Sequence, residues 1–225
     1  MGHDDRMMTG VMMLADDNPA WKLRPVEQAR AACEGGASAI QLRTQFATDR
    51  LAFEWALEIR AITRDFGARL FINDRFDLAL LAEADGVHLG QDDIAPDQIP
   101  SDSRTRLAIG RSTHTLAQVD SALAEPVEYI AFGPIFGTLS KDSPYPPRGI
   151  QMLADVVRRC APRPVIAIGG IDRDNAEQLA RAGVAAIAVI SAVAAADNPA
   201  AATRALVEAM ARGTLQATRP ERAQP

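Results

Sequence analysis

The chain has 225 residues, of which 48% are hydrophobic and 24% charged, and its formal net charge at pH 7 is −5. This length fits one sizeable α/β domain, and the acidic balance argues against a nucleic-acid surface, because binding a phosphate backbone requires a basic face. No apolar stretch reaches the ~20 residues that span a bilayer, and the N-terminus lacks a signal-peptide pattern, so we expect a cytoplasmic protein.

Short apolar runs typical of buried strands recur along the chain, separated by segments with apolar residues at helical spacing. The runs expected to form strands are Val11–Ala15, Ala39–Arg43, Arg69–Ile72, Gly86–Leu89, Leu107–Gly110, Tyr129–Phe132, Val165–Ile168 and Ala186–Ile190. Amphipathic helices are expected at Pro25–Glu34, Asp49–Phe66, Thr115–Leu123 and Gln151–Cys160. Eight alternating units of strand and helix predict a closed (β/α)8 TIM barrel; an open flavodoxin-like sheet is the alternative if two runs are not strands.

The barrel is expected to form a single domain over residues 11–212. Residues 1–10 are polar and irregular, which predicts a flexible N-terminal segment. Residues 213–225 are rich in Arg, Pro, Gln and Ala without an apolar period, which predicts a disordered tail. Cys33 and Cys160 are the only cysteines, and we interpret them as reduced packing residues.

In a barrel of this kind, chemistry takes place at the rim formed by the carboxyl ends of the strands. Gln41 and Arg43 close the second predicted strand and point to the same side of it. Their amide and guanidinium groups are suitable donors for a polar ligand. The alternative is that Arg43 pairs with a buried carboxylate, either Asp16 or Asp17.

Two acidic positions follow neighbouring strands. Asn73 and Asp74 come directly after the third predicted strand, and Asp92 and Asp93 follow the fourth. If the strands are adjacent and parallel, Asp74 and Asp93 meet at one rim and form an oxygen site suited to Mg²⁺ and a substrate phosphate. The alternative is that Asp74 caps the helix that follows it, and that Asp92 or Asp93 caps a short helix near Pro96–Ile99.

The fifth predicted strand leads into Ser112, Thr113 and His114. Ser112 is a candidate donor to a phosphate or to a ring substituent, and the alternative is that Ser112 or Thr113 caps the next helix. His114 is either an acid–base group or an exposed residue of the first helical turn. His88, inside the fourth strand, is interpreted as a hydrogen-bonded core residue.

The segment at 133–149 holds four prolines, three glycines and the polar residues Thr138, Ser140 and Lys141. Long rim loops of this type commonly bind ligands, and two hydroxyls beside a lysine suit an anionic group. A stiff surface loop without ligand contacts is the alternative.

The last two strands end in Gly169–Gly170 and in Ile190–Ser191. Glycines let backbone N–H groups approach an anion closely, and phosphate sites after the last two strands recur in such barrels. These ends therefore predict a phosphate site without specifying a reaction.

Taken together, these segments resemble the thiamine phosphate synthase family over roughly residues 11–210. The segments that carry the resemblance are QLR at 41–43, INDR at 72–75, ADGVHLGQDD at 84–93, GRSTH at 110–114, GPIFGTLSK at 133–141 and AIGGI at 167–171. The resemblance implies a barrel enzyme that joins a pyrimidine diphosphate to a thiazole phosphate, giving thiamine phosphate and pyrophosphate.

The resemblance also implies roles for individual residues. Asp74 and Asp93 would bind Mg²⁺. The residues that would bind the pyrimidine and its diphosphate are Gln41, Arg43, Gln45, Asn73, Ser112 and Lys141, of which Lys141, Arg43 and Ser112 would be catalytic. The thiazole phosphate would be bound by Thr138, Ser140, Gly170, Ile190 and Ser191. The implied partners are these small molecules, and whether the chain forms a homo-oligomer stays open.

The chain departs from the family pattern at Gln45, where a lysine is usual. This change removes one cation from the expected diphosphate site. The nearest alternative is a related thiazole tautomerase, in which His114 would become the acid–base group. A non-catalytic sensor of phosphate ligands on the same barrel is a further alternative.

Overall fold

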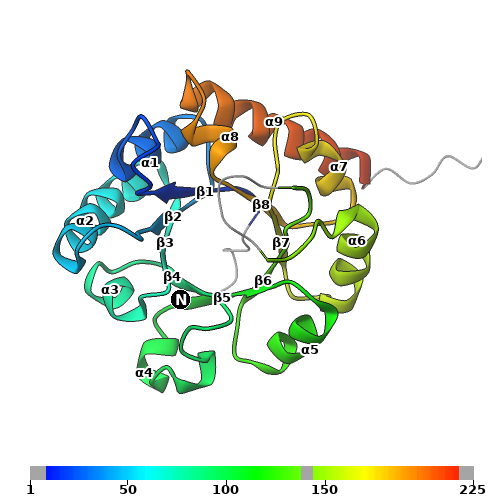
Figure 1. Ribbon diagram of the computed structural model, residues 1–225, viewed down its shortest axis with the longest axis horizontal. Helices are drawn as coiled ribbons and strands as arrows, with labels where there is room; N and C mark the ends of the chain where they lie inside the picture. Colours follow the sequence, from blue (N-terminus) through cyan, green and yellow to red (C-terminus); the bar gives the residue numbers. More distant parts are fainter. Residues whose placement is uncertain (1–8, 138–143, 218–225) are drawn as a thin grey trace, which may run out of the picture.

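The computed structural model describes residues 9–137 and 144–217. Within these residues, eight parallel strands close into a barrel in which each strand pairs with the next and β8 pairs with β1 (Figure 1). The strands are β1 (Gly10–Asp16), β2 (Ala39–Arg43), β3 (Arg69–Asn73), β4 (Gly86–Leu89), β5 (Ala108–Thr113), β6 (Tyr129–Phe132), β7 (Val165–Ile168) and β8 (Ala186–Val189). The predicted TIM barrel is confirmed, and the open-sheet alternative is wrong.

The helices surround this barrel on the outside (Figure 1). They are α1 (Pro25–Glu34), α2 (Asp49–Phe66), α3 (Phe76–Leu81), α4 (Ser101–Arg104), α5 (Leu116–Ala124), α6 (Gly149–Cys160), α7 (Ala176–Arg181), α8 (Ser191–Ala194) and α9 (Pro199–Ala217), with a 3₁₀ turn, η1, at Pro96–Gln98. Local signals fix their ends: Thr48 caps α2 by accepting from Leu51 N–H, and Gly67 ends α2 with φ of +68°. Among the described helices, none has both the length and the apolar character needed to cross a bilayer.

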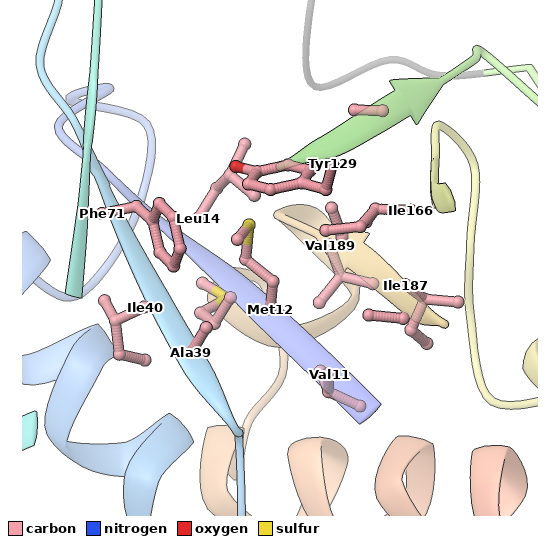
Figure 2. Packing of buried hydrophobic residues seen from close by; sticks show 14 of the residues in the cluster. Val11, Met12, Leu14, Ala39, Ile40, Phe71, Tyr129, Ile166, Ile187 and Val189 are labelled. Atoms are coloured by element: carbon pink, nitrogen blue, oxygen red, sulfur yellow. The ribbon is translucent and has the colours of Figure 1, made fainter. Parts of the chain in front are cut away.

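Large aromatic residues fill the inside of the barrel beneath the carboxyl rim. Phe71 and Tyr129 meet edge to face with ring centroids 5.7 Å apart, and Met12 packs beside them (Figure 2). Glycines on neighbouring strands make room for these rings. A Cβ atom at Gly110 would lie 2.0 Å from Cζ of Tyr129, and one at Gly86 would lie 2.4 Å from Cε1 of Phe71. Such close contacts exclude a larger residue at either position.

The C-terminal boundary differs from the sequence prediction. Helix α9 continues to Ala217, so the disordered tail predicted from Gly213 is wrong for residues 213–217. Gly213 is buried against α7, and a Cβ atom there would lie 2.3 Å from the carbonyl oxygen of Glu177 and 2.6 Å from Cβ of Ala180. The glycine permits close packing of α9 against α7. The sequence prediction missed this because glycine has a low helix propensity. Residues 218–225 and 1–8 lie outside the described part of the chain, and Gly10 already belongs to β1.

Both cysteines are buried and unpaired, as predicted. Burial raises the pKa of the Cys33 thiol and of the Cys160 thiol to about 11, because the charged thiolate is poorly solvated there. We expect a thiol reagent at pH 8 to leave the native protein unmodified and to label both residues after unfolding in guanidinium. Rapid labelling of either thiol in the native protein would contradict the packing described here.

Candidate active site

A cavity of about 210 Å³ opens at the carboxyl ends of the strands. Its lining comprises Met12, Leu14, Gln41, Arg43, Gln45, Asn73, Asp74, His88, Gly90, Asp92, Asp93, Ser112, Tyr129, Ala131, Ile166, Ile168 and Ala188. Seven of the residues that the sequence assigned to substrate or metal are among them: Gln41, Arg43, Gln45, Asn73, Asp74, Asp93 and Ser112. The cavity therefore brings both predicted metal-binding carboxylates to the same space as the predicted amide and guanidinium donors.

Asp74 is held at the cavity by an unusual backbone conformation. Its φ is +64°, a left-handed conformation that aspartate tolerates better than most residues, and its N–H donates to the carbonyl of His88 on β4 at 2.8 Å. The N-cap of α3 is Arg75, which makes no side-chain cap, so the interpretation of Asp74 as a helix cap is wrong. Strain of this kind is retained where the surrounding structure imposes it, often at functional sites.

Arg75, the residue after Asp74, does not line the cavity. Arg75 forms ion pairs with Asp49 at 2.7 Å and with Asp77 at 2.7 Å. Hydrogen bonds from Arg75 hold the pKa of the Asp77 carboxyl below its usual value. Since Arg75 is engaged with these two carboxylates and does not line the cavity, it is not the counter-charge of the cavity carboxylates.

Asp93 closes a tight turn at the end of β4. Its Oδ2 accepts from the N–H of Gly90 at 2.6 Å, and the carbonyl of Gly90 accepts from Nη1 of Arg111. The N-cap of η1 is Ala95, so neither Asp92 nor Asp93 is its capping residue, and that alternative is wrong. The turn fixes the position of the Asp93 side chain at the cavity.

Arg43 lies at the cavity and is also paired with a buried carboxylate. It lines the cavity, and its Nη1 also pairs with Oδ2 of Asp16, which lies directly opposite it in the β1–β2 register. The side chains of Arg43 and Asp16 are only 8% and 2% exposed. Asp16 thus holds a guanidinium group at the edge of the cavity.

A hydrogen-bonded chain crosses the cavity wall from β6 to β5. Nδ1 of His88 lies 2.9 Å from the Tyr129 hydroxyl, and Nε2 of His88 lies 2.8 Å from Oγ of Ser112. Burial raises the pKa of the Tyr129 phenol, so this hydroxyl stays protonated. Ser112 belongs to β5, and Thr115 caps α5, so the interpretation of Ser112 or Thr113 as a helix cap is wrong.

Sequence reasoning missed His88 and Tyr129 as cavity residues. His88 is hydrogen-bonded and 7% exposed, as predicted for a core residue, yet it also lines the cavity. One signal was available: Gly110 separates these two side chains in register, with His88 opposite it on one side and Tyr129 on the other. A glycine inside a strand commonly marks a place where another group approaches closely.

Among the predicted phosphate-site residues that the structure describes, Gly170, Ile190 and Ser191 do not line this cavity. Gly170 has φ of +66°, and a Cβ atom there would lie 2.3 Å from the carbonyl oxygen of Gly137. Ile190 is the N-cap residue of α8, and Ser191 is its first residue. All three predicted residues therefore follow β7 and β8 at the same rim. Thr138, Ser140 and Lys141 lie outside the described residues.

His114 lies away from the cavity lining, at the end of β5. Its Nδ1 lies 2.7 Å from the carbonyl of Gly133, which can only accept a hydrogen bond, so this nitrogen carries a proton. The ring stacks on Tyr145 with centroids 4.2 Å apart. His114 is therefore fixed against the segment that follows β6.

A closed (β/α)8 barrel with carboxylates, a buried arginine and strand-end glycines at its carboxyl rim defines the class of barrel enzymes that bind phosphorylated substrates. The family model for thiamine monophosphate synthase matches residues 11–193. The chain belongs to this family, and the resemblance stated from the sequence is confirmed.

Individual relatives agree with this family. A thiamine-phosphate synthase of Anaeromyxobacter dehalogenans is 46% identical over 189 residues, covering 84% of each chain. The solved thiamine phosphate pyrophosphorylase of Pyrococcus furiosus is 34% identical with a TM-score of 0.82, covering 92% of this chain and 96% of its own. A thiamine phosphate pyrophosphorylase of Bacteroides thetaiotaomicron, 16% identical with a TM-score of 0.64 over 93% of this chain and 99% of its own, supports the fold alone.

Proposed function

We propose that the chain condenses 4-amino-2-methyl-5-hydroxymethylpyrimidine diphosphate with a thiazole phosphate, releasing pyrophosphate and forming thiamine phosphate. The observation that carries this proposal is the common cavity lined by Asp74, Asp93 and Arg43. Two carboxylates and a guanidinium group at one cavity suit a diphosphate ester that binds together with a divalent cation. The name shared by the relatives supports the same activity.

The pyrimidine ring is assigned to the inner part of the cavity. Met12, Tyr129 and Ile166 supply apolar wall there, while Gln41 and Asn73 supply amide groups for ring nitrogens and the amino group. The volume of about 210 Å³ is large enough for one small heteroaromatic ring.

The donor set at the rim fits Mg²⁺. Within residues 9–137 and 144–217, no cluster of three or more His, Cys, Asp or Glu side chains could enclose a metal. Mg²⁺ commonly takes only one or two carboxylates and completes its shell with water and substrate phosphate oxygens, so Asp74 and Asp93 suffice. When bound, the cation would supply charge neutralisation for the diphosphate.

The reaction needs no enzyme nucleophile. The bond between the pyrimidine methylene carbon and the diphosphate oxygen breaks, and its electron pair leaves with the pyrophosphate. The resulting methylene cation is delocalised over the aminopyrimidine, and the thiazole nitrogen donates its lone pair to form the new C–N bond. Arg43 and Lys141 are assigned to the departing charge, and Ser112, oriented by His88, to the pyrimidine diphosphate.

The thiazole phosphate is assigned to residues that follow β6, β7 and β8 in the sequence. The proposed residues are Thr138, Ser140, Gly170, Ile190 and Ser191. The left-handed glycines after β7 and the start of α8 after β8 support this assignment, because both present backbone N–H groups at one rim.

We also propose that the enzyme works in the cytoplasm, where unpaired cysteines are usual. A homo-oligomeric state stays a prediction.

The experiment that tests this function measures pyrophosphate release with both substrates and with each one alone. We expect Mg²⁺-dependent release only when both substrates are present, with thiamine phosphate formed in equal amount. Metal-independent isomerisation of the thiazole phosphate without pyrophosphate would instead indicate a tautomerase that uses His114. Binding of either phosphate without turnover would indicate a sensor.

Gln45 gives a separate prediction, since it lines the cavity where the family usually has lysine. The Gln45→Lys variant should lower KM for the pyrimidine diphosphate by up to about tenfold, because a charge-assisted contact to the diphosphate is restored while solvent screens part of it. Gln45→Glu, of similar size, should raise that KM. Steady-state kinetics with no change in either variant would remove residue 45 from the diphosphate site.

A further inference from the structure

Two adjacent carboxylates, Asp16 at the end of β1 and Asp17 directly after it, bind the last residue of β2 and the segment that follows it. Neither carboxylate lines the cavity. We propose that Asp16 and Asp17 form a clamp that positions residues 43–47, the segment assigned to the diphosphate. Asp16 acts on the side chain of Arg43, and Asp17 acts on the backbone that carries Gln45. This inference rests on the proposed function, because it assigns positioning residues to the same site.

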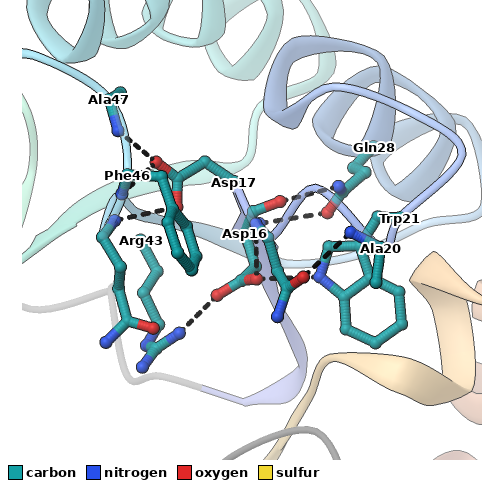
Figure 3. Close-up of polar contacts among 10 residues, drawn as sticks. Asp16, Asp17, Ala20, Trp21, Gln28, Arg43, Phe46 and Ala47 are labelled. Atoms are coloured by element: carbon teal, nitrogen blue, oxygen red, sulfur yellow. Dashed lines mark hydrogen bonds and ion pairs between the residues drawn. The ribbon is translucent and has the colours of Figure 1, made fainter.

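Both carboxylate oxygens of Asp16 have hydrogen-bond or ion-pair partners. Its Oδ1 accepts from the indole N–H of Trp21 at 2.8 Å and from the N–H of Asn18 at 3.0 Å, while Oδ2 pairs with Arg43 (Figure 3). The buried amide of Gln28 fixes the backbone of the same residue, accepting from Asp16 N–H at 3.0 Å and donating to Asp16 C=O at 2.9 Å. A carboxylate held by so many contacts can fix the orientation of the guanidinium group.

Asp17 binds three consecutive backbone N–H groups of the loop. Oδ1 accepts from Gln45 N–H at 2.8 Å, and Oδ2 accepts from Phe46 N–H at 2.9 Å and Ala47 N–H at 2.8 Å (Figure 3). In addition, the Asp17 N–H donates to the carbonyl of Arg43 at 3.2 Å. The carboxylate therefore organises a loop whose own side chains bury little: Gln45 is exposed, and Phe46 is 65% exposed.

The negative charge is needed for this geometry. An ionised carboxylate is an acceptor at both oxygens, whereas an asparagine amide offers one acceptor oxygen and an NH₂ group that would face another N–H donor. An asparagine at position 17 can thus accept hydrogen bonds from only some of the three N–H groups. Because the loop is exposed and lies outside the core, its loosening should leave the rest of the barrel intact.

The first test is Asp17→Asn in the full-length chain. We expect KM for the pyrimidine diphosphate to rise roughly tenfold, while KM for the thiazole phosphate changes less than about twofold and the melting temperature falls by no more than about 3 °C. Hydrogen exchange should become faster at the amides of Gln45, Phe46 and Ala47 and stay unchanged in β2. Glu54→Gln, which removes an exposed α2 carboxylate paired with Arg50, is the matched control and should change none of these quantities.

The second test asks whether Asp16 acts through Arg43. Asp16→Asn should lower kcat/KM for the pyrimidine diphosphate by roughly tenfold or more in the native chain. In an Arg43→Met background the same change should have little further effect on kcat/KM, because the cation that Asp16 orients is already gone. Additive losses in the double variant would overturn the positioning role of Asp16.

The outcomes separate the clamp from the proposed function. If the unmodified chain releases no pyrophosphate with both substrates, the proposed function fails, while the hydrogen-exchange result still tests whether Asp17 orders the loop. If the unmodified chain is active and Asp17→Asn leaves KM for the pyrimidine diphosphate unchanged, the clamp is overturned and the function stands. The clamp would also be overturned if Asp17→Asn lowered the melting temperature and kcat and raised KM for both substrates together. That pattern would indicate a purely structural role.

Discussion

Replacing Asp93 with asparagine is expected to lower kcat/KM by about a hundred- to a thousandfold, the range found when a group that stabilises developing charge is removed. Asparagine keeps an oxygen that can accept from Gly90 N–H, so the turn after β4 should persist and the melting temperature should change little. The concentration of Mg²⁺ needed for half-maximal activity should rise as well, because one carboxylate ligand is lost.

Asp97→Asn is the matched control for this variant, since Asp97 is exposed in η1 and does not line the cavity. Asp74→Asn should behave like Asp93→Asn, because asparagine also tolerates the left-handed φ of +64°. A Mg²⁺ titration that is identical for Asp93→Asn and the unmodified chain would remove Asp93 from the metal site.

Arg43→Met is expected to reduce both stability and activity. The substitution leaves the carboxylate of Asp16, 2% exposed, without its cationic partner. Breaking a buried ion pair from one side typically lowers the free energy of unfolding by about 3–5 kcal/mol, measurable by urea denaturation. Pyrophosphate release should fall in the same variant, even at temperatures where it remains folded, because a cation at the diphosphate is lost.

Arg43→Lys separates the two effects. Lysine retains the charge but not the planar fork of the guanidinium group, so stability should fall less than in Arg43→Met while activity still falls. Equal stability of Arg43→Met and the unmodified chain would show that the pair with Asp16 does not contribute as described.

Much of the fold followed from local patterns. The predicted bounds of β2, β4, β6 and β7 match the structure, because strands buried on both faces appear as short, mainly apolar runs. β5 was predicted at Leu107–Gly110 but spans Ala108–Thr113. The polar residues of its last half obscured the run. In the barrel Ser112 lines the cavity, Arg111 donates to the carbonyl of Gly90, and Thr113 donates to the carbonyl of Ala131.

The part of the candidate site that depends only on strand order was predictable from the sequence. Asp74 and Asp93 follow adjacent parallel strands, so their meeting at one rim required only the strand order. The rejection of the cap interpretations required tertiary information, because the backbone of Asp74 is set by its bond to His88 on β4. Likewise, the choice between Asp16 and Asp17 as partner of Arg43 depended on the β1–β2 register.

The most direct test of the account is a crystal structure with Mn²⁺ and pyrophosphate, in which anomalous scattering locates the cation. We predict one peak in the cavity, bonded to a carboxylate oxygen of both Asp74 and Asp93 and to pyrophosphate oxygens that also contact Arg43. A cation bound to only one of these carboxylates, or pyrophosphate bound away from Arg43, would contradict it.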